Sequence, residues 1–272
     1  EAAAPPASPA SPLAGLPGGA AFGTLVHEVL EEPDPAALDE RCRAAVARRA
    51  GIGIDPVALA DALRPVLHTP LADLGCTLGS VVAGDRLAEL TFELPLAGGD
   101  DSRVGDPGAD DSRAGATLAD VAALLRRHDL GPVADYPDRM ADLEPQALRG
   151  FLTGSIDLLL RLPGPSYAVV DHKTNRLGAD PLTAWHYRPE ALAAEMLRSH
   201  YVLQALLYSV ATHRFLRWRQ AGYDPERHLG PVLYTFVRGM CGPHTPVGAG
   251  VFRWRPPPSL VIELSDLLAG RP

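Results

Sequence analysis

The sequence predicts an α/β fold in which a mixed central sheet is flanked by helices and preceded by a helical section. Two β-rich runs, residues 150–162 and 166–174, are separated by a Pro-Gly-Pro turn, which is typical of a hairpin. A long stretch with helical periodicity, residues 188–220, leads to another apolar strand, residues 230–239. Strands before the helices and a strand after them indicate the mixed sheet.

The composition is that of one large domain without a generally basic surface. The 272 residues are 46% hydrophobic and carry a formal net charge of −8. This is enough apolar material for a substantial core, and the charge excludes a wholly basic nucleic-acid coat protein. Contact with a polyanion must therefore be local, through a basic patch or a metal ion.

Cysteine usage and hydropathy indicate a reducing compartment, which we take to be the cytoplasm. Cys42, Cys76 and Cys241 lie far apart, so they predict neither a disulfide framework nor a zinc or iron–sulfur site. No apolar run is long enough to span a bilayer, and we expect no membrane contact.

Residues 1–21 are expected to form a flexible Pro/Ala linker ahead of a folded domain that spans residues 22–272. They lack the basic start and continuous apolar core of a signal peptide. The chain opens on Glu1 rather than Met, and we expect a fragment from the C-terminal side of a longer protein.

The remaining elements follow from local pattern. Amphipathic helices are expected at residues 22–32, 35–50 and 56–68, the last broken near Pro65. A strand at 86–96 precedes an acidic stretch, 97–116, which is too poor in apolar residues to pack and is expected to be a disordered loop. Further helices are expected at 117–128 and 257–270.

The hairpin carries two aspartates that can meet at one end of the sheet. Asp157 lies in its first strand and Asp171 ends the apolar run of the second. Two neighbouring carboxylates repel each other unless they share a proton or bind a divalent cation. Magnesium prefers oxygen ligands and retains waters, so two aspartates and one or two other groups suffice for a site.

Lys173 is the only lysine in the chain, and it follows Asp171 by two positions. Side chains two apart on a strand point to the same face, so the amine is expected beside whatever Asp171 binds. A lysine can orient or deprotonate an attacking water, whereas arginine is not deprotonated in proteins. A surface hairpin with an Asp–Lys salt bridge is the alternative, and for an isolated D-x-K it is the better one.

Several motifs in order resemble one family. The segments GSIDLLL, YAVVDHKTN, YVLQALLYSVATHRFLRWR and YDPERHLGPVLYTFVRGM resemble the C-terminal nuclease domains of the RecB family, in the PD-(D/E)xK nuclease superfamily. The resemblance runs from FGTLVHEVLEE at residue 22 to FVRGM at residue 240. It implies a restriction-endonuclease-like core and a Mg²⁺-dependent deoxyribonuclease of the exodeoxyribonuclease V type, acting in break repair, recombination and degradation of linear DNA.

The resemblance also implies the residues of the site. Metal ligands would be His27, Asp157, Asp171 and the backbone carbonyl of His172, with Lys173 as the catalytic amine. His172 stands where the family has tyrosine, which matters little if only its carbonyl is used. Without the resemblance, His27 would be taken for an ordinary helix histidine.

Gln204 and Tyr208 resemble the Q-x-x-x-Y element of the family. Four residues apart on a helix, they share a face and are expected to support the site and the nucleic-acid backbone. Ordinary helix packing is the equal alternative. Glu89 matches a glutamate found before the aspartates in related nucleases, and it fits an edge-strand charge equally well.

A basic cluster with one aromatic residue is the candidate DNA-binding surface. Arg214, Arg217, Arg219 and Arg238 are expected to follow phosphates, and Trp218 to stack on a base of a single strand. The alternative is a solvated helix face.

Cofactor and partners are implied by the family alone. We expect Mg²⁺, with Mn²⁺ as a substitute and no iron–sulfur cluster, and as partners DNA, the helicase part of RecB, RecC and RecD. No P-loop motif is present, so this chain itself is not expected to hydrolyse ATP. Two other functions stay open: a stand-alone exonuclease of the superfamily, which the three scattered cysteines disfavour, and a catalytically inactive scaffold.

Overall fold

The sheet is mixed, as predicted, and its strands are in sequence order. The computed structural model describes residues 8–49, 51–97, 115–143 and 148–271. Within them, one five-stranded sheet has the order β1-β2-β3-β4-β5. The strands are β1 (Arg86–Pro95), β2 (Phe151–Leu162), β3 (Ser166–Lys173), β4 (Leu229–Phe236) and β5 (Val251–Trp254). Only β3 and β4 pair in parallel; the other neighbours are antiparallel.

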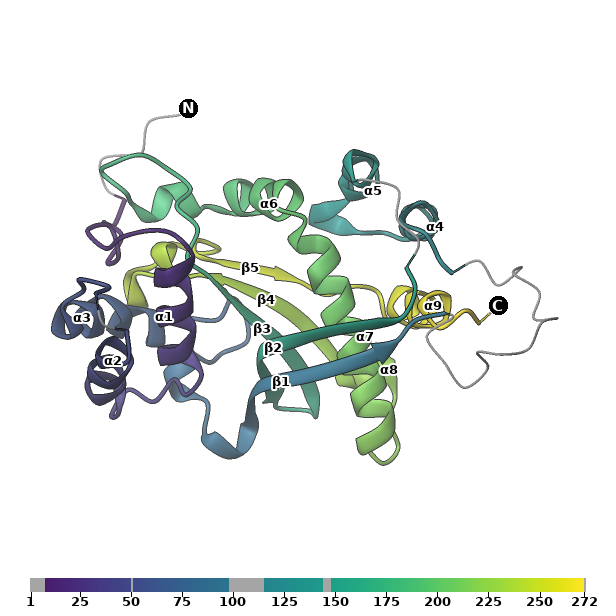
Figure 1. The fold of residues 1–272 in the computed structure, drawn as a ribbon, viewed down its shortest axis with the longest axis horizontal. Coiled ribbons are helices and arrows are strands. Elements are labelled where there is room, and N and C mark those ends of the chain that lie inside the picture. The colour runs from purple at the N-terminus through teal and green to yellow at the C-terminus, as the bar shows by residue number, and fades with distance from the viewer. Residues whose placement is uncertain (1–7, 50, 98–114, 144–147, 272) are drawn as a thin grey trace.

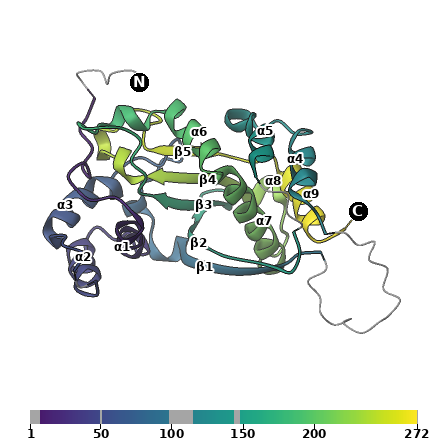
Figure 2. The ribbon, with the colours of Figure 1, turned by 45° about the horizontal axis from the view of Figure 1, so that its top comes forward.

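Helices cover both faces of the sheet and gather at its two ends. Figures 1 and 2 show α1 (Ala20–Leu30), α2 (Leu38–Ala47) and α3 (Pro56–Leu67) together at one end of the molecule. At the other end lie α4 (Leu118–Leu125), the short α5 (Tyr136–Arg139) and α9 (Pro258–Leu268). The connection from β3 to β4 is formed by α6 (Pro189–Arg198), α7 (Tyr201–Arg219) and the short α8 (Pro225–His228).

Alternation along β3 separates two hydrophobic cores. Val169 packs with α7 and α9 on one face, and Val170 packs with α1 and α3 on the other. Because side chains alternate on a strand, Asp171 continues the Val169 face and His172 the Val170 face. The polar end of β3 therefore presents a carboxylate toward α7 and an imidazole toward α1.

The β2–β3 hairpin and the long connection from β3 to β4 explain why β3 and β4 pair in parallel. The hairpin predicted at residues 150–174 is present as β2 and β3, joined by a turn in which Gly164 has a φ of 88°. Strands that pair in parallel need a long connection, which α6 and α7 supply. As a result α7 begins near the end of β3 that carries Lys173.

Three local expectations differ from the structure. The strand β5 was not predicted, and β4 ends at Phe236 with a single 3₁₀ turn over residues 237–239. The predicted break near Pro65 is wrong, because α3 continues through Pro65 to Leu67.

Within the described residues, every helix is too short or too polar to cross a membrane. The loop expected at 97–116 lies almost wholly outside the described residues, and so do residues 1–7 of the expected linker.

Residues 8–17 pack against the domain, contrary to the flexible linker expected for residues 1–21. Leu13 is fully buried, and backbone hydrogen bonds join Ser11 to Leu182 and Ala184 to Pro9. Composition misled here because a Pro/Ala segment can be held through its own backbone carbonyls, which composition does not reveal. We call residues 8–17 the N-terminal strap.

Candidate active site

The two predicted aspartates and the lysine meet at the end of the hairpin. Lys173 Nζ lies 2.6 Å from Asp171 Oδ2, both on the α7 face of β3. Asp157 Oδ2 accepts a hydrogen bond of 2.7 Å from the backbone N–H of His172. The backbone of β3 thus connects Asp157 directly to the residue between Asp171 and Lys173.

His27 reaches the same place from α1. The buried stripe of α1 (Phe22, Leu25, Val26, Val29 and Leu30) packs on the sheet, and His27 lies beside this stripe with a third of its side chain exposed. Its Nδ1 is 3.2 Å from Asp157 Oδ2, and its ring meets the His172 ring edge-on at 5.9 Å. The helix packing therefore brings an imidazole to the carboxylates.

Burial and mutual repulsion give the two carboxyl groups different proton affinities. Burial raises the pKa of Asp171 to about 6, and the neighbouring Asp157 charge adds to this, while the charge of Lys173 opposes it. Burial also acts to raise the pKa of Asp157. There, the His27 hydrogen bond and the nearby imidazole charges outweigh burial, and the pKa is lowered. Such a divergent pair is typical of functional sites.

The two histidines also differ. Burial acts to lower the pKa of His27, but the hydrogen bond and charge of Asp157 outweigh it, so the pKa is raised. Burial lowers the pKa of His172 to about 4. The His172 ring lies on the α1 face, where Nδ1 is 2.6 Å from the Thr235 hydroxyl. The ring is therefore directed away from the face that carries Asp171.

Gln204 and Tyr208 join the site through Lys173. Gln204 Oε1 accepts from Lys173 Nζ at 3.1 Å, and its Nε2 donates to the Tyr208 hydroxyl at 2.8 Å. The structure also adds Tyr234 of β4, whose hydroxyl donates to Gln204 Oε1 at 3.0 Å. Tyr234 was missed because a tyrosine in a buried strand gives no signal of its own in the sequence.

Glu89 lies at the edge of the site. It has a φ of 48° and no ladder partner, between the pairs Ala88–Leu158 and Leu90–Ile156, so it forms a bulge opposite Asp157. Its Oε2 accepts from the Ser155 hydroxyl at 2.8 Å. The pairing register of β1 and β2 places Glu89 near Asp157, but the side chain of Glu89 accepts its hydrogen bond from Ser155.

The predicted basic cluster is not one surface. Arg238 is fully buried, with its donors bonded to the carbonyls of Thr174, Leu13, Leu16 and Pro17, so its DNA-binding assignment is wrong: no donor is left facing solvent. Arg214 is held against α9, where it donates to the hydroxyl and carbonyl oxygens of Ser265.

Trp218 and its basic neighbours remain exposed at the far end of α7. Trp218 is 72% exposed, and the guanidinium of Arg219 stacks 3.8 Å from its ring. Trp218 lies fourteen positions after Gln204, or about 21 Å along a helix. This pair is separate from the carboxylates.

A divalent cation fits the donor set, although the side chains are not gathered around one point. Asp171 Oδ2 is buried and, among the described residues, has no hydrogen-bond partner; its contact with Lys173 is an ion pair without hydrogen-bond geometry. Two carboxylates, one of them deeply buried beside an ammonium group, have the oxygen donors that a hard cation prefers. Within residues 8–49, 51–97, 115–143 and 148–271, no group of three His, Cys, Asp or Glu side chains has the arrangement of a metal site.

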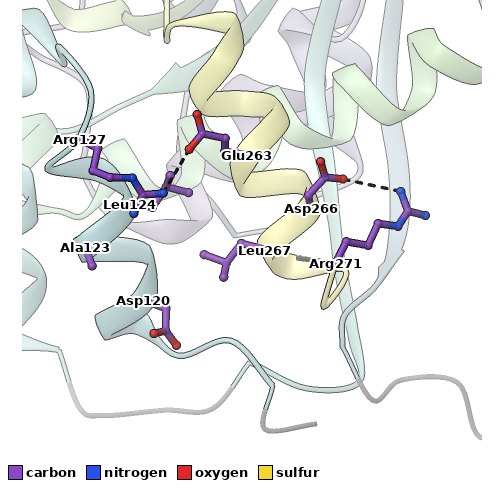
Figure 3. A pocket seen from close by; sticks show the side chains of 8 residues that line it. All are labelled: Asp120, Ala123, Leu124, Arg127, Glu263, Asp266, Leu267 and Arg271. Atoms are coloured by element: carbon purple, nitrogen blue, oxygen red, sulfur yellow. Dashed lines mark hydrogen bonds and ion pairs between the residues drawn. The ribbon is translucent and has the colours of Figure 1, made fainter.

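The hollow between α4 and α9 is a different feature. It has a volume of about 450 Å³, and Figure 3 shows Arg127 paired with Glu263 and Asp266 with Arg271 along its walls. Its lining includes none of the residues predicted for the site. Four of its charged groups form these two ion pairs, and Asp120 accepts hydrogen bonds from Thr117.

Comparisons with known proteins identify the family. The chain is 53% identical over 277 residues to "RecBCD enzyme subunit RecB" of Mycobacterium tuberculosis, with 95% of this chain and 24% of the relative covered. The subunits of the same name from Mycolicibacterium smegmatis and Escherichia coli are 47% and 32% identical, over 95% and 94% of this chain and 24% and 20% of each relative. No protein-family model matches the sequence. The chain spans about a quarter of the length of the mycobacterial relatives, and it belongs to the RecB family.

Proposed function

We propose that the chain is a Mg²⁺-dependent nuclease domain that hydrolyses phosphodiester bonds in DNA. The observation that carries the proposal is the convergence of Asp157, Asp171 and Lys173 at one end of a hairpin, with Nζ and Oδ2 2.6 Å apart. An isolated surface salt bridge is a weaker explanation, because the Asp171 side chain is 3% exposed and that of Lys173 13%. Burial at this level needs a compensating role for the charges.

Asp157, Asp171 and His27, with the carbonyl of His172, would hold the metal ion. When bound, Mg²⁺ would polarise the scissile phosphate and lower the pKa of a coordinated water. Mn²⁺ has a similar preference for oxygen and imidazole ligands and is expected to substitute.

Lys173 would act on the reacting groups beside the metal. Its amine, on the same face as Asp171, would orient the attacking water or neutralise charge that develops on the phosphate. Gln204 Oε1 accepts a hydrogen bond from the same amine. His27 and the His172 N–H hold Asp157 ionised, because both stabilise the charged carboxylate.

At the level of the whole protein, the name of the relatives supplies the context. Relatives named RecBCD enzyme subunit RecB lead us to propose that this domain works within a longer RecB polypeptide, with RecC and RecD, on DNA ends in the cytoplasm. Its roles would be recombination, repair of double-strand breaks and degradation of linear DNA.

The test is cleavage of end-labelled linear DNA by the purified chain with Mg²⁺, Mn²⁺ or Ca²⁺. We expect cleavage with Mg²⁺ and Mn²⁺, and loss of at least about a hundredfold in Lys173→Ala and Asp171→Asn. Asp85→Asn is the matched control, since Asp85 pairs with Arg161 on the surface.

The inactive scaffold gives the opposite result. Absence of cleavage by the wild type, together with no heat of Mg²⁺ or Mn²⁺ binding in calorimetry, would replace the nuclease by that function. Equal cleavage by the wild type and Lys173→Ala would reject the site while leaving nuclease activity to be located elsewhere.

A further inference from the structure

The amine of Lys173 lies against two tyrosine rings. Its Nζ is 4.2 Å from the ring centroid of Tyr201 and 5.2 Å from that of Tyr234. The two rings stack on each other, with centroids 5.6 Å apart and planes 23° apart. An ammonium within about 6 Å of an aromatic face is attracted by the negative face of the ring. The nearer ring, Tyr201, begins the segment YVLQALLYSVATHRFLRWR, but it was not among the residues predicted for the site.

Hydrogen bonds hold both rings in place. The one proton of the Tyr234 hydroxyl is shared between Gln204 Oε1 and the Tyr201 carbonyl oxygen, which lie 3.0 and 3.1 Å away. The Tyr201 hydroxyl donates to Asn175 Oδ1 at 3.2 Å. Asn175 in turn donates to Glu195 Oε1 at 2.8 Å. Tyr201 is thereby tied to the chain two residues beyond Lys173.

This arrangement limits where the amine can go. A lysine side chain has four rotatable bonds, and one hydrogen bond to Gln204 does not fix the direction of its ammonium group. The Tyr201 face adds a further contact to those that Asp171 and Gln204 make with the amine. A ring held at both its backbone and its hydroxyl can do this with little motion of its own.

We propose that Tyr201 is a positioning residue whose ring face holds the Lys173 amine beside Asp171. The inference rests on the proposed nuclease function for its catalytic consequence. The placement of the amine is a separate, measurable claim. The hydrogen bond from the Tyr201 hydroxyl to Asn175 holds the ring in place, and the face of the ring contacts the Lys173 amine.

The single lysine makes the placement directly observable. Protein labelled with ¹³C-lysine gives one lysine side-chain signal set, from Lys173. We expect the ε-methylene protons to be shifted upfield by the Tyr201 ring in the wild type and in Tyr201→Phe, and to move toward the free-lysine position in Tyr201→Leu. An unchanged signal in Tyr201→Leu overturns the proposal.

Kinetics on linear DNA give the second measurement. Tyr201→Leu should lower kcat by about tenfold with little change in KM, and Tyr201→Phe should recover most of it because the ring face remains. Equal loss in the two variants would assign the effect to the hydroxyl and overturn the proposal. Tyr223→Leu is the matched control: Tyr223 is half-buried like Tyr201, but it bonds to His213.

A failure of the proposed nuclease function would give different results from a failure of the Tyr201 positioning role. If neither the wild type nor Lys173→Ala cleaves DNA, the nuclease assignment is rejected, while the lysine signal still decides whether Tyr201 holds the amine. If the wild type cleaves and Tyr201→Leu keeps its kcat, the nuclease function stands and the positioning role is rejected.

Discussion

The guanidinium of Arg238 donates a hydrogen bond of 2.6 Å to the carbonyl of Leu13, which lies 225 positions earlier in the chain. The same side chain donates to the carbonyl of Thr174, immediately after Lys173. One buried arginine therefore joins the N-terminal strap, the end of β4 and the loop that follows β3. The role of Arg238 is structural, and the stability of an Arg238 variant tests it.

Arg238→Met should lower the free energy of unfolding by about 3 kcal/mol, because several buried carbonyls lose a charged donor at once. Urea unfolding measures the change. Arg126→Met is the control, since Arg126 is half-exposed and forms a surface pair with Asp138, which should contribute less than about 1 kcal/mol. Equal effects in the two variants would show that the strap does not depend on Arg238.

The pKa of Asp171 predicts a pH dependence of stability. Burial and Asp157 raise this pKa from 3.8 to about 6, so the folded state binds the proton more tightly than the unfolded state. Stability from this group is complete below about pH 4 and is lost as the pH rises to about 6. The metal-free wild type should lose about 3 kcal/mol relative to Asp171→Asn between pH 4 and pH 7.

Urea unfolding of both proteins in EDTA, at those two pH values, measures this difference. Using the difference between variants removes the titration of groups that the two proteins share. A constant gap between the curves would mean that Asp171 keeps an ordinary pKa and that its carboxylate is compensated in the folded protein.

Gln204 should matter for turnover more than for binding. Gln204→Leu removes the acceptor of Lys173 and of the Tyr234 hydroxyl, and we expect kcat on linear DNA to fall about tenfold or more. Gln220→Leu is the matched control, because Gln220 accepts from Tyr167 at the other end of α7. A rise in KM without a change in kcat would place Gln204 in DNA binding instead.

Trp218 tests the remaining candidate for DNA contact. Trp218→Ala should weaken binding of a single-stranded oligonucleotide by about tenfold, as expected for loss of one base stack, and leave the melting temperature unchanged. Fluorescence anisotropy measures the binding. Val247→Ala removes a fully exposed apolar side chain as the control, and equal affinity in both variants would exclude Trp218 from the DNA path.

The sequence predicted the elements with strong periodicity. The hairpin, the helices on either side and the parallel strand follow from apolar alternation and helical spacing, and they place Asp157, Asp171 and Lys173 at the same end of the hairpin. The strand β5 was not predicted because it has only four residues, with Arg253 inside it and prolines soon after it. A run that short carries too little pattern to separate a strand from a loop.

Side chains whose roles depend on tertiary contacts were harder to predict. Arg238 belongs to a basic-looking set in the sequence, yet the structure buries it completely among backbone carbonyls, which every residue possesses. Tyr201 is one aromatic residue at the start of a helix, and its contact with Lys173 depends on the crossover from β3 to β4. Such contacts are set by tertiary structure rather than by local sequence.

The N-terminal strap has a mechanical consequence. Its backbone is fastened through Arg238 to Thr174, so a load applied to the chain near Pro9 reaches the residue after Lys173 by a route that bypasses α1. A displacement of the strap would therefore be transmitted to the loop that follows Lys173.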